Sequence, residues 1–129
     1  ESEYFPTAIL KNSLSQVGKV LSPAERDTKY IIITFNDYSY FENNIHNLRK
    51  LSKNKNIMII GIPINLEIVD KAQFVIDGEP AFQICRLSPK DIFKIENNDQ
   101  VYFTLNSGKI IAKFAGDLDE TAMGIIETF

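Results

Sequence analysis

The chain has 129 residues, of which 44% are hydrophobic and 24% charged; this suits one domain with a single core and excludes global disorder. Fourteen Lys and Arg stand against 17 Asp and Glu, and the net charge of -3 excludes a general attraction for nucleic acid. We therefore predict one domain over residues 1–129 and no nucleic-acid partner.

Residues 1–21 mix polar and apolar side chains without a clear period. Pro6 interrupts this segment before residues 7–10, whose composition is typical of a short strand. We interpret residues 1–21 as an N-terminal arm or hairpin. The chain begins with Glu1 rather than Met, which we interpret as a trimmed end, and a removed export signal would leave no trace in the sequence.

Residues 30–62 carry the strongest secondary-structure signal. The run YIIITF at 30–35 and the run IMIIGI at 57–62 are continuously apolar, which is typical of strands buried on both faces of a sheet. A strand, helix, strand order of this length predicts a right-handed crossover between two parallel strands. The intervening segment has the apolar spacing of an amphipathic helix, at Phe41, Ile45, Leu48 and Leu51.

Residues 64–98 give weaker signals. The period of INLEIVDKAQF at 64–74 is ambiguous between helix and strand, so we expect a short helix or an irregular turn there. AFQICRL at 81–87 alternates as a short strand or extended segment does. The segment SPKDIFKIENN at 88–98 predicts a helix, with Ser88 as N-cap and Pro89 in the first turn. Its apolar face would be formed by Ile92, Phe93 and Ile95.

The last third of the chain predicts an antiparallel hairpin followed by a short helix. Strands at 101–105 and 109–114 flank a Gly-containing turn, and Asp117 or Asp119 would cap the closing helix. The apolar face of that helix would be Leu118, Ala122, Ile125 and Ile126. We expect one mixed sheet whose largely buried residues include Ile32, Phe35, Ile59, Phe103 and Ile111.

This order of elements resembles the thioredoxin fold, an α/β fold with three layers and a central mixed sheet. The stretch VYFTLNSGKIIAKFAGDLD at 101–119 is also similar to the end of membrane-anchored thiol–disulfide oxidoreductases and peroxiredoxin-related proteins. The resemblance covers most of residues 30–129. It implies that the redox motif of the family would fall in NDYSYFENN at 36–44, and that a cis-proline would fall near Gln100.

Both of these redox elements are absent from the sequence. Residues 36–44 contain no Cys, and no Pro stands near Gln100, where we expect a trans peptide bond. Thiol–disulfide exchange needs a thiolate of lowered pKa and, in its two-cysteine form, a second thiol. The single Cys85 excludes a CxxC pair, so we predict no disulfide reductase or isomerase activity.

Three further candidate sites have simpler structural interpretations. Cys85 lies in an alternating segment, where a free Cys is most often a small buried hydrophobic residue; a peroxidatic or sensor role is the alternative. Glu42 and His46 are one helical turn apart, but two ligands do not make a metal site. Ser39 with His46 as base lacks the glycines of a nucleophile elbow. We therefore predict no metal and no cofactor.

The former redox edge is the strongest candidate for binding. Ligands of open α/β sheets gather at the carboxyl ends of strands, where helix N-termini offer free N–H groups. The residues placed there are Asp37, Tyr38, Ser39 and Tyr40, with Gln100 close by. Their aromatic side chains either anchor the loop and the core or form a binding surface, and in the second case we expect Tyr40→Ala and Asp37→Ala to weaken binding with little change in melting temperature.

These observations predict a non-redox thioredoxin-like binding or interaction module, whose protein or small-ligand partner the sequence does not identify. The alternatives are a one-cysteine thiol peroxidase or reductase that uses Cys85, and an accessory domain of a longer protein. The longest apolar runs have strand length, so no transmembrane segment is predicted. Analogy with exported relatives predicts a bacterial extracytoplasmic location, in the periplasm or lipid-anchored at the cell envelope.

Overall fold

The computed structural model describes residues 3–6, 9, 29–53, 57–64, 75–76, 79–80, 83–95, 98–105 and 108–128. The proposed N-terminal arm and the segment 65–74 lie largely outside the described residues.

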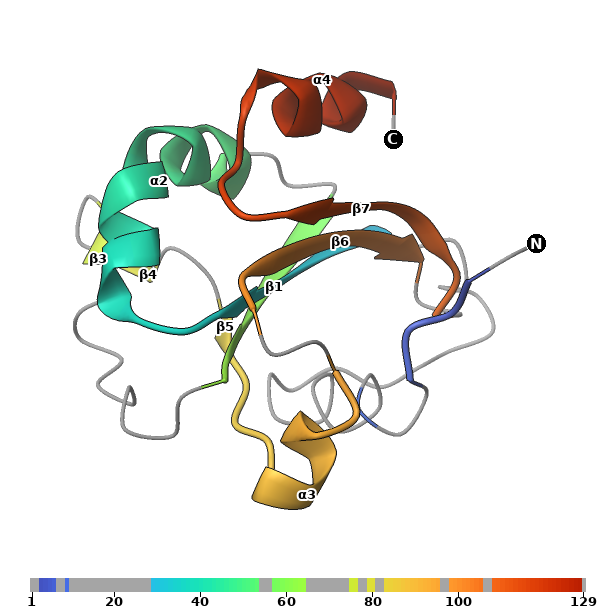
Figure 1. Cartoon of the computed structure of the whole chain (residues 1–129). Helices are drawn as coiled ribbons and strands as arrows, with labels where there is room; N and C mark the ends of the chain where they lie inside the picture. The colour runs from blue at the N-terminus through green and yellow to red at the C-terminus, as the bar shows by residue number, and fades with distance from the viewer. Residues whose placement is uncertain are drawn as a thin grey trace.

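A five-stranded mixed sheet with the order β5-β2-β1-β6-β7 forms the centre of the described fold (Figure 1). Its strands are β1 (Lys29–Phe35), β2 (Ile57–Pro63), β5 (Gln83–Ile84), β6 (Gln100–Leu105) and β7 (Ile110–Ala115). A separate two-stranded sheet pairs β3 (Val75–Ile76) with β4 (Glu79–Pro80). The helices that lie within the described residues are α2 (Tyr38–Ser52), α3 (Pro89–Ile92) and α4 (Glu120–Thr128).

The strand pairing confirms the predicted topology. β1 and β2 are parallel neighbours, with Ile31 opposite Ile59, while β6 is antiparallel to both β1 and β7. Figure 1 shows α2 and α4 on one side of the sheet and α3 on the other. The sheet is therefore covered by helices on both sides, which is the three-layer arrangement of the thioredoxin fold.

Strand β1 is buried from Tyr30 to Phe35, as its continuous apolar sequence predicts. Successive side chains of a strand point to opposite faces, so β1 contributes to two cores. The first core lies under α2 and α4 and includes Ile31, Ile33, Phe35, Phe41, Leu48, Val101 and Phe103. The second core lies on the α3 side and includes Phe5, Tyr30, Ile32, Ile60, Ile62, Cys85 and Tyr102.

The prediction that Ile111 is largely buried is wrong, because its side chain is 47% exposed. β7 is an outer strand of the sheet, and the β6–β7 register shifts between Phe103 and Thr104. Phe103 is opposite Ala112 and Thr104 is opposite Ile110, so Ile111 has no partner residue across the pair. A prediction from strict alternation along β7 does not include this irregularity, and it therefore assigns Ile111 to the wrong face of the strand.

The predicted helix over residues 88–98 is also wrong in length, because α3 ends at Ile92. Ser88 caps it by accepting a hydrogen bond from the Asp91 backbone N–H, as expected. One helical turn cannot place three apolar residues on one face. Ile92 and Ile95 pack against the second core, whereas Phe93 is 88% exposed.

The closing helix α4 is capped by Asp119, one of the two residues predicted for that role. The carboxylate of Asp119 accepts a hydrogen bond from the Ala122 backbone N–H at 2.8 Å, which is the N-cap interaction. Asp117 instead contacts α2, as described below. Leu118 and Ala122 are buried in the first core and Ile125 packs against it; the side chain of Ile126 lies outside the described set.

Candidate functional site

The loop between β1 and α2 lies at the predicted edge of the sheet. Asp37 has an extended backbone with φ -153° and is the N-cap of α2. Its carboxylate accepts hydrogen bonds from the Ser39 backbone N–H, at 2.9 Å, and from the Ser39 hydroxyl. These hydrogen bonds, above all the one from the hydroxyl, hold the pKa of Asp37 below its ordinary value. Asp37 and Ser39 are both exposed.

We expect the stability contribution of Asp37 to depend on pH. Its folded pKa lies below the ordinary value of 3.8, so the contribution is present above pH 3.8 and is lost as the pH falls through the lowered folded value. Asp37→Ala should therefore lower the melting temperature at pH 7, which corrects the expectation from sequence of little change, because Asp37 is the N-cap of α2. Asp37→Asn should retain most of the capping. Thermal unfolding of the wild type and the two variants between pH 7 and pH 2 measures this pH dependence. A difference in melting temperature between wild type and Asp37→Ala that stays constant over the whole range would contradict the prediction.

The start of β6 joins this edge through Asp99. One carboxylate oxygen of Asp99 accepts a hydrogen bond from the Asn36 backbone N–H at 2.8 Å. Gln100 lies opposite Thr34 in the β1–β6 pair, so it is close to the loop, as predicted. Its side chain is only 3% exposed, however, and its amide donates a hydrogen bond to the side-chain oxygen of Asn98 at 2.9 Å. The described residues contain no cis peptide bond.

Gln100 is therefore buried, and its assignment to the exposed binding surface needs correction. Gln100 is two residues before Tyr102, so strand alternation turns its side chain toward the second core, on the face of the sheet opposite α2.

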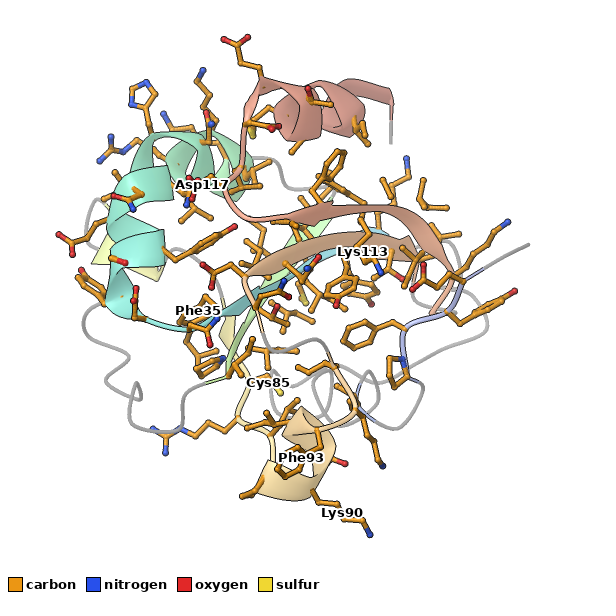
Figure 2. All side chains as sticks on the ribbon, viewed as in Figure 1. Phe35, Cys85, Lys90, Phe93, Lys113 and Asp117 are labelled. Atoms are coloured by element: carbon orange, nitrogen blue, oxygen red, sulfur yellow. The ribbon has the colours of Figure 1, made fainter. Side chains whose placement is uncertain are left out.

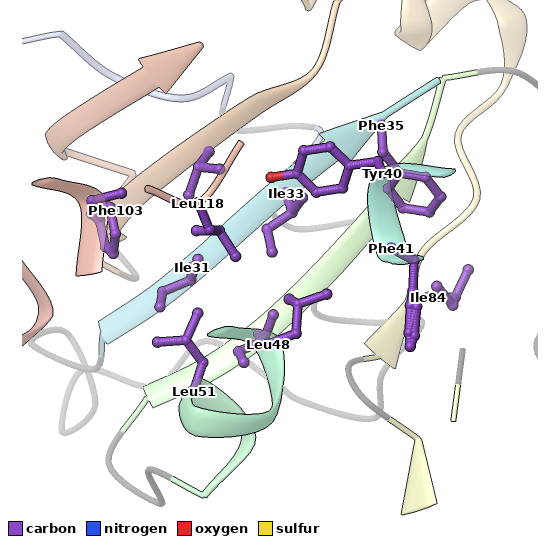
Figure 3. Close-up of a cluster of buried hydrophobic side chains, with 13 residues drawn as sticks. Ile31, Ile33, Phe35, Tyr40, Phe41, Leu48, Leu51, Ile84, Phe103 and Leu118 are labelled. Atoms are coloured by element: carbon purple, nitrogen blue, oxygen red, sulfur yellow. The ribbon is translucent and has the colours of Figure 1, made fainter. Parts of the chain in front are cut away.

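Tyr40 needs the same correction. Its side chain is 3% exposed and stacks on Phe35, with ring centroids 6.5 Å apart and an interplanar angle of 16° (Figure 3). Tyr40 and Phe41 both belong to the first core. Tyr38 is half-buried and packs edge-to-face on Phe41 at 5.5 Å. Of the two interpretations of these aromatic residues, core packing holds for Tyr40, since the first turn of α2 turns this side chain toward the sheet.

The hydroxyl group of Tyr40 is the unusual feature of this part of the core. The oxygen is buried and has no hydrogen-bond partner among the described residues. Burial, and after it the negative charges of Asp99 and Asp117, raise the pKa of Tyr40 far above its ordinary value. The phenol thus stays neutral and faces a region of negative potential.

Asn44 connects α2 with the segment after β7, a role that the sequence analysis missed. Its side-chain amide donates hydrogen bonds to the backbone oxygen of Tyr40 at 2.7 Å and to a carboxylate oxygen of Asp117 at 3.0 Å. Its side-chain oxygen accepts one from the Leu118 backbone N–H at 2.8 Å. A signal was available, because Asn44 is a polar residue four positions before Leu48, on the apolar stripe of the helix.

Cys85 lies on the other side of the sheet from this edge (Figure 2). It is fully buried in the second core, and its thiol contacts the backbone oxygen of Arg86 at 3.9 Å. This confirms the interpretation of Cys85 as a small buried residue. Apolar burial disfavours the thiolate that disulfide chemistry requires.

Glu42 and His46 are exposed on α2. Within the part of the chain that the structure describes, no three His, Cys, Asp or Glu side chains come close enough to hold a metal ion. None of the described helices is long and apolar enough to cross a membrane.

No protein-family model matches the sequence, and no curated protein matches it either. Solved structures do match. A thio-disulfide isomerase from Thermus thermophilus has a TM-score of 0.60 and 17% identity, and the match covers 87% of this chain and 85% of that chain. A SCO1/SenC family lipoprotein from Bacillus anthracis has a TM-score of 0.58 and 17% identity, with coverage of 99% and 90%.

A thiol-disulfide oxidoreductase from Bacteroides fragilis has a TM-score of 0.56 and 16% identity, and the match covers 100% of both chains. At identities this low the likeness concerns the fold. The chain has a thioredoxin-like α/β fold. It contains one cysteine in all, whereas a CxxC pair needs two.

Proposed function

We propose that this chain is a non-redox binding module of thioredoxin-like fold, and that the edge formed by the β1–α2 loop binds its partner. One observation carries the proposal: Asp37 caps α2 at the position that the resemblance assigns to the redox motif. The Asp37 carboxylate already accepts the Ser39 backbone N–H group that would otherwise stabilise a thiolate. A second negative charge at that helix end is disfavoured.

The names of the similar structures include thiol-disulfide isomerase and oxidoreductase, which makes thiol exchange the competing function. Cys85 weighs against thiol exchange, because this residue is buried on the opposite side of the sheet and the chain contains no second cysteine. The proposed surface consists of exposed Asp37 and Ser39 with half-buried Tyr38. Tyr40 lies beneath that surface, in the first core.

We further propose that residues 1–129 act as one domain, alone or as an accessory part of a longer protein, in a bacterial extracytoplasmic compartment. The name of the Bacillus anthracis structure, a lipoprotein, supports a location at the cell envelope.

The purified protein should not reduce insulin disulfides, because a dithiol couple needs two thiols within reach. Native Cys85 should also react with a thiol reagent at least about 100-fold more slowly than in urea, since the thiol is buried and inaccessible in the folded protein. Insulin turbidity and reagent absorbance measure the two rates. Insulin turnover that disappears in Cys85→Ser would support the competing function and overturn the non-redox one.

The binding surface is tested with a partner recovered from the source organism on immobilised protein. Ser39→Arg places a large side chain on the proposed surface, and Asn43→Arg places the same side chain at another exposed position of α2. We expect Ser39→Arg to weaken binding of the recovered partner about tenfold or more, which corresponds to about 1.4 kcal/mol, and Asn43→Arg to change it little. Equal effects of the two variants, with melting temperatures unchanged, would place the partner elsewhere.

A further inference from the structure

Three carboxylates lie on the segments that end at the edge described above: Asp37, Asp99 and Asp117, here called the acidic edge. Asp37 follows the end of β1, Asp99 precedes β6, and Asp117 follows β7. Strand pairing brings them together, because Gln100 lies opposite both Thr34 of β1 and Ala115 of β7. Figure 2 shows Asp117 between α2 and the end of β7.

No ion pair links the acidic edge to a Lys or Arg that the structure describes. The basic residues of α2 lie in its last turn, Arg49 and Lys50, at the opposite end of the helix. The edge therefore carries uncompensated negative charge within the described part of the chain. Carboxylates in this state favour a cation.

A second observation, independent of charge, points to a ligand at this edge. The Tyr40 side chain is 97% buried, since only 3% is exposed, and its hydroxyl oxygen has no hydrogen-bond partner among the described residues. Buried polar groups of native proteins are nearly always paired. Figure 3 shows the hydroxyl pointing away from Phe35 and toward the side of Leu118, the residue that follows Asp117.

The hydrogen bonds of these groups leave three oxygen atoms without a partner among the described residues. Asp99 and Asp117 are near enough to raise the pKa of Tyr40, yet neither accepts a hydrogen bond from its hydroxyl. Each of the two carboxylates uses its Oδ1 atom within the fold, for Asn36 and for Asn44. The Oδ2 atoms have no hydrogen bond to a described residue, so the edge offers three oxygen atoms: two carboxylate oxygens and the phenol.

We propose that the acidic edge binds a primary ammonium group, the side chain of a lysine in a partner protein, between Asp99 and Asp117 with the Tyr40 hydroxyl as the third acceptor. This rests on the proposed function and specifies the chemistry of its partner. An ammonium group has three N–H donors, which match three acceptors. A guanidinium group prefers both oxygens of one carboxylate, and here one oxygen of each is already used.

The burial of the three groups fits a long side chain. Asp117 is exposed and Asp99 is half-buried, so the carboxylates form the outer layer, with the Tyr40 hydroxyl beneath them. The apolar stem of a lysine spans such a depth while the partner backbone stays at the surface.

The test is a titration of the isotope-labelled protein, followed by NMR, with a blocked pentapeptide that contains one central lysine among glycines. The same peptide with acetyl-lysine is the neutral control, and butylammonium tests whether the ammonium group alone suffices. We expect the lysine peptide to shift the Asp99 and Leu118 amide signals and the Tyr40 ring signals, and the acetylated peptide to shift none of them. Binding of butylammonium equal to that of the lysine peptide would identify a free amine, rather than a protein side chain, as the ligand.

Three variants assign the site. Tyr40→Phe removes only the hydroxyl; it should weaken peptide binding about fivefold to tenfold, because a buried hydrogen bond to a charged group is lost, while the melting temperature stays the same or rises. Asp117→Asn should weaken binding about tenfold or more. Asp119→Asn is the matched control, since it removes the same charge two residues away and keeps a good N-cap. Its effect should be less than about threefold, as for a screened surface charge.

Equal effects of Asp117→Asn and Asp119→Asn, or unchanged binding in Tyr40→Phe, would overturn the ammonium site. So would a lysine peptide that shifts no signal of the acidic edge. The proposed function fails separately: a recovered partner that is insensitive to Ser39→Arg contradicts the edge as a binding surface, whereas a partner that is sensitive to Ser39→Arg and insensitive to Tyr40→Phe contradicts only the ammonium site.

Discussion

Tyr40→Ala is expected to lower the free energy of unfolding by about 3–5 kcal/mol, which is typical of a buried aromatic residue replaced by Ala. Tyr40 is 3% exposed, stacks on Phe35 and belongs to the first core. Its removal leaves a cavity between the first turn of α2 and the sheet. This reverses the expectation from sequence that Tyr40→Ala would affect recognition with little change in stability.

Urea denaturation followed by circular dichroism measures this loss, and two variants control it. Tyr40→Phe keeps the ring and should be at least as stable as the wild type, because the deleted hydroxyl has no partner among the described residues. Tyr38→Ala, at a half-buried position, should cost about 1–2 kcal/mol less than Tyr40→Ala. A loss below about 1 kcal/mol in Tyr40→Ala would contradict its place in the core.

Asn44→Ala is expected to cost about 2–4 kcal/mol. Asn44 is 4% exposed and makes three hydrogen bonds, to the Tyr40 backbone oxygen, the Asp117 carboxylate and the Leu118 N–H group. Its removal leaves the Leu118 N–H group unpaired and buried, and each unpaired buried polar group costs about 1–3 kcal/mol. The variant should also loosen the segment that positions Asp117 in the acidic edge.

Asn47→Ala is the matched control for Asn44→Ala. Asn47 is half-buried and its side-chain amide donates one hydrogen bond, to the Leu118 backbone oxygen at 2.7 Å. Its replacement should cost about 1 kcal/mol, the net value of an ordinary hydrogen bond. Equal losses in the two variants would show that Asn44 has no special role. Hydrogen exchange of the Leu118 amide gives a second measurement, and we expect faster exchange only in Asn44→Ala.

The sequence by itself determined the class of fold and the missing chemistry. The continuous apolar runs at 30–35 and 57–62 predict central strands because only strands covered on both faces need no polar alternation. The chain contains one cysteine, Cys85, and a CxxC pair needs two, so the composition alone excludes that pair. The order of these elements then predicted the parallel β1–β2 pair and the antiparallel hairpin that the structure has.

Only the tertiary structure decided which residues of the candidate site are accessible. Tyr40 and Gln100 are residue types that suit a polar and aromatic surface, yet helix phase turns Tyr40 toward the sheet and strand alternation turns Gln100 toward the second core. Ile111 and Phe93 are exposed because an irregular strand pair and a one-turn helix break the periodicity on which sequence prediction depends.

The meeting of Tyr40, Asp99 and Asp117 likewise arises from strand register and from the Asn44 side chain, which join segments distant along the chain. Local patterns carry no information about such long-range contacts, and that is the physical reason why the acidic edge could be found only in the folded molecule.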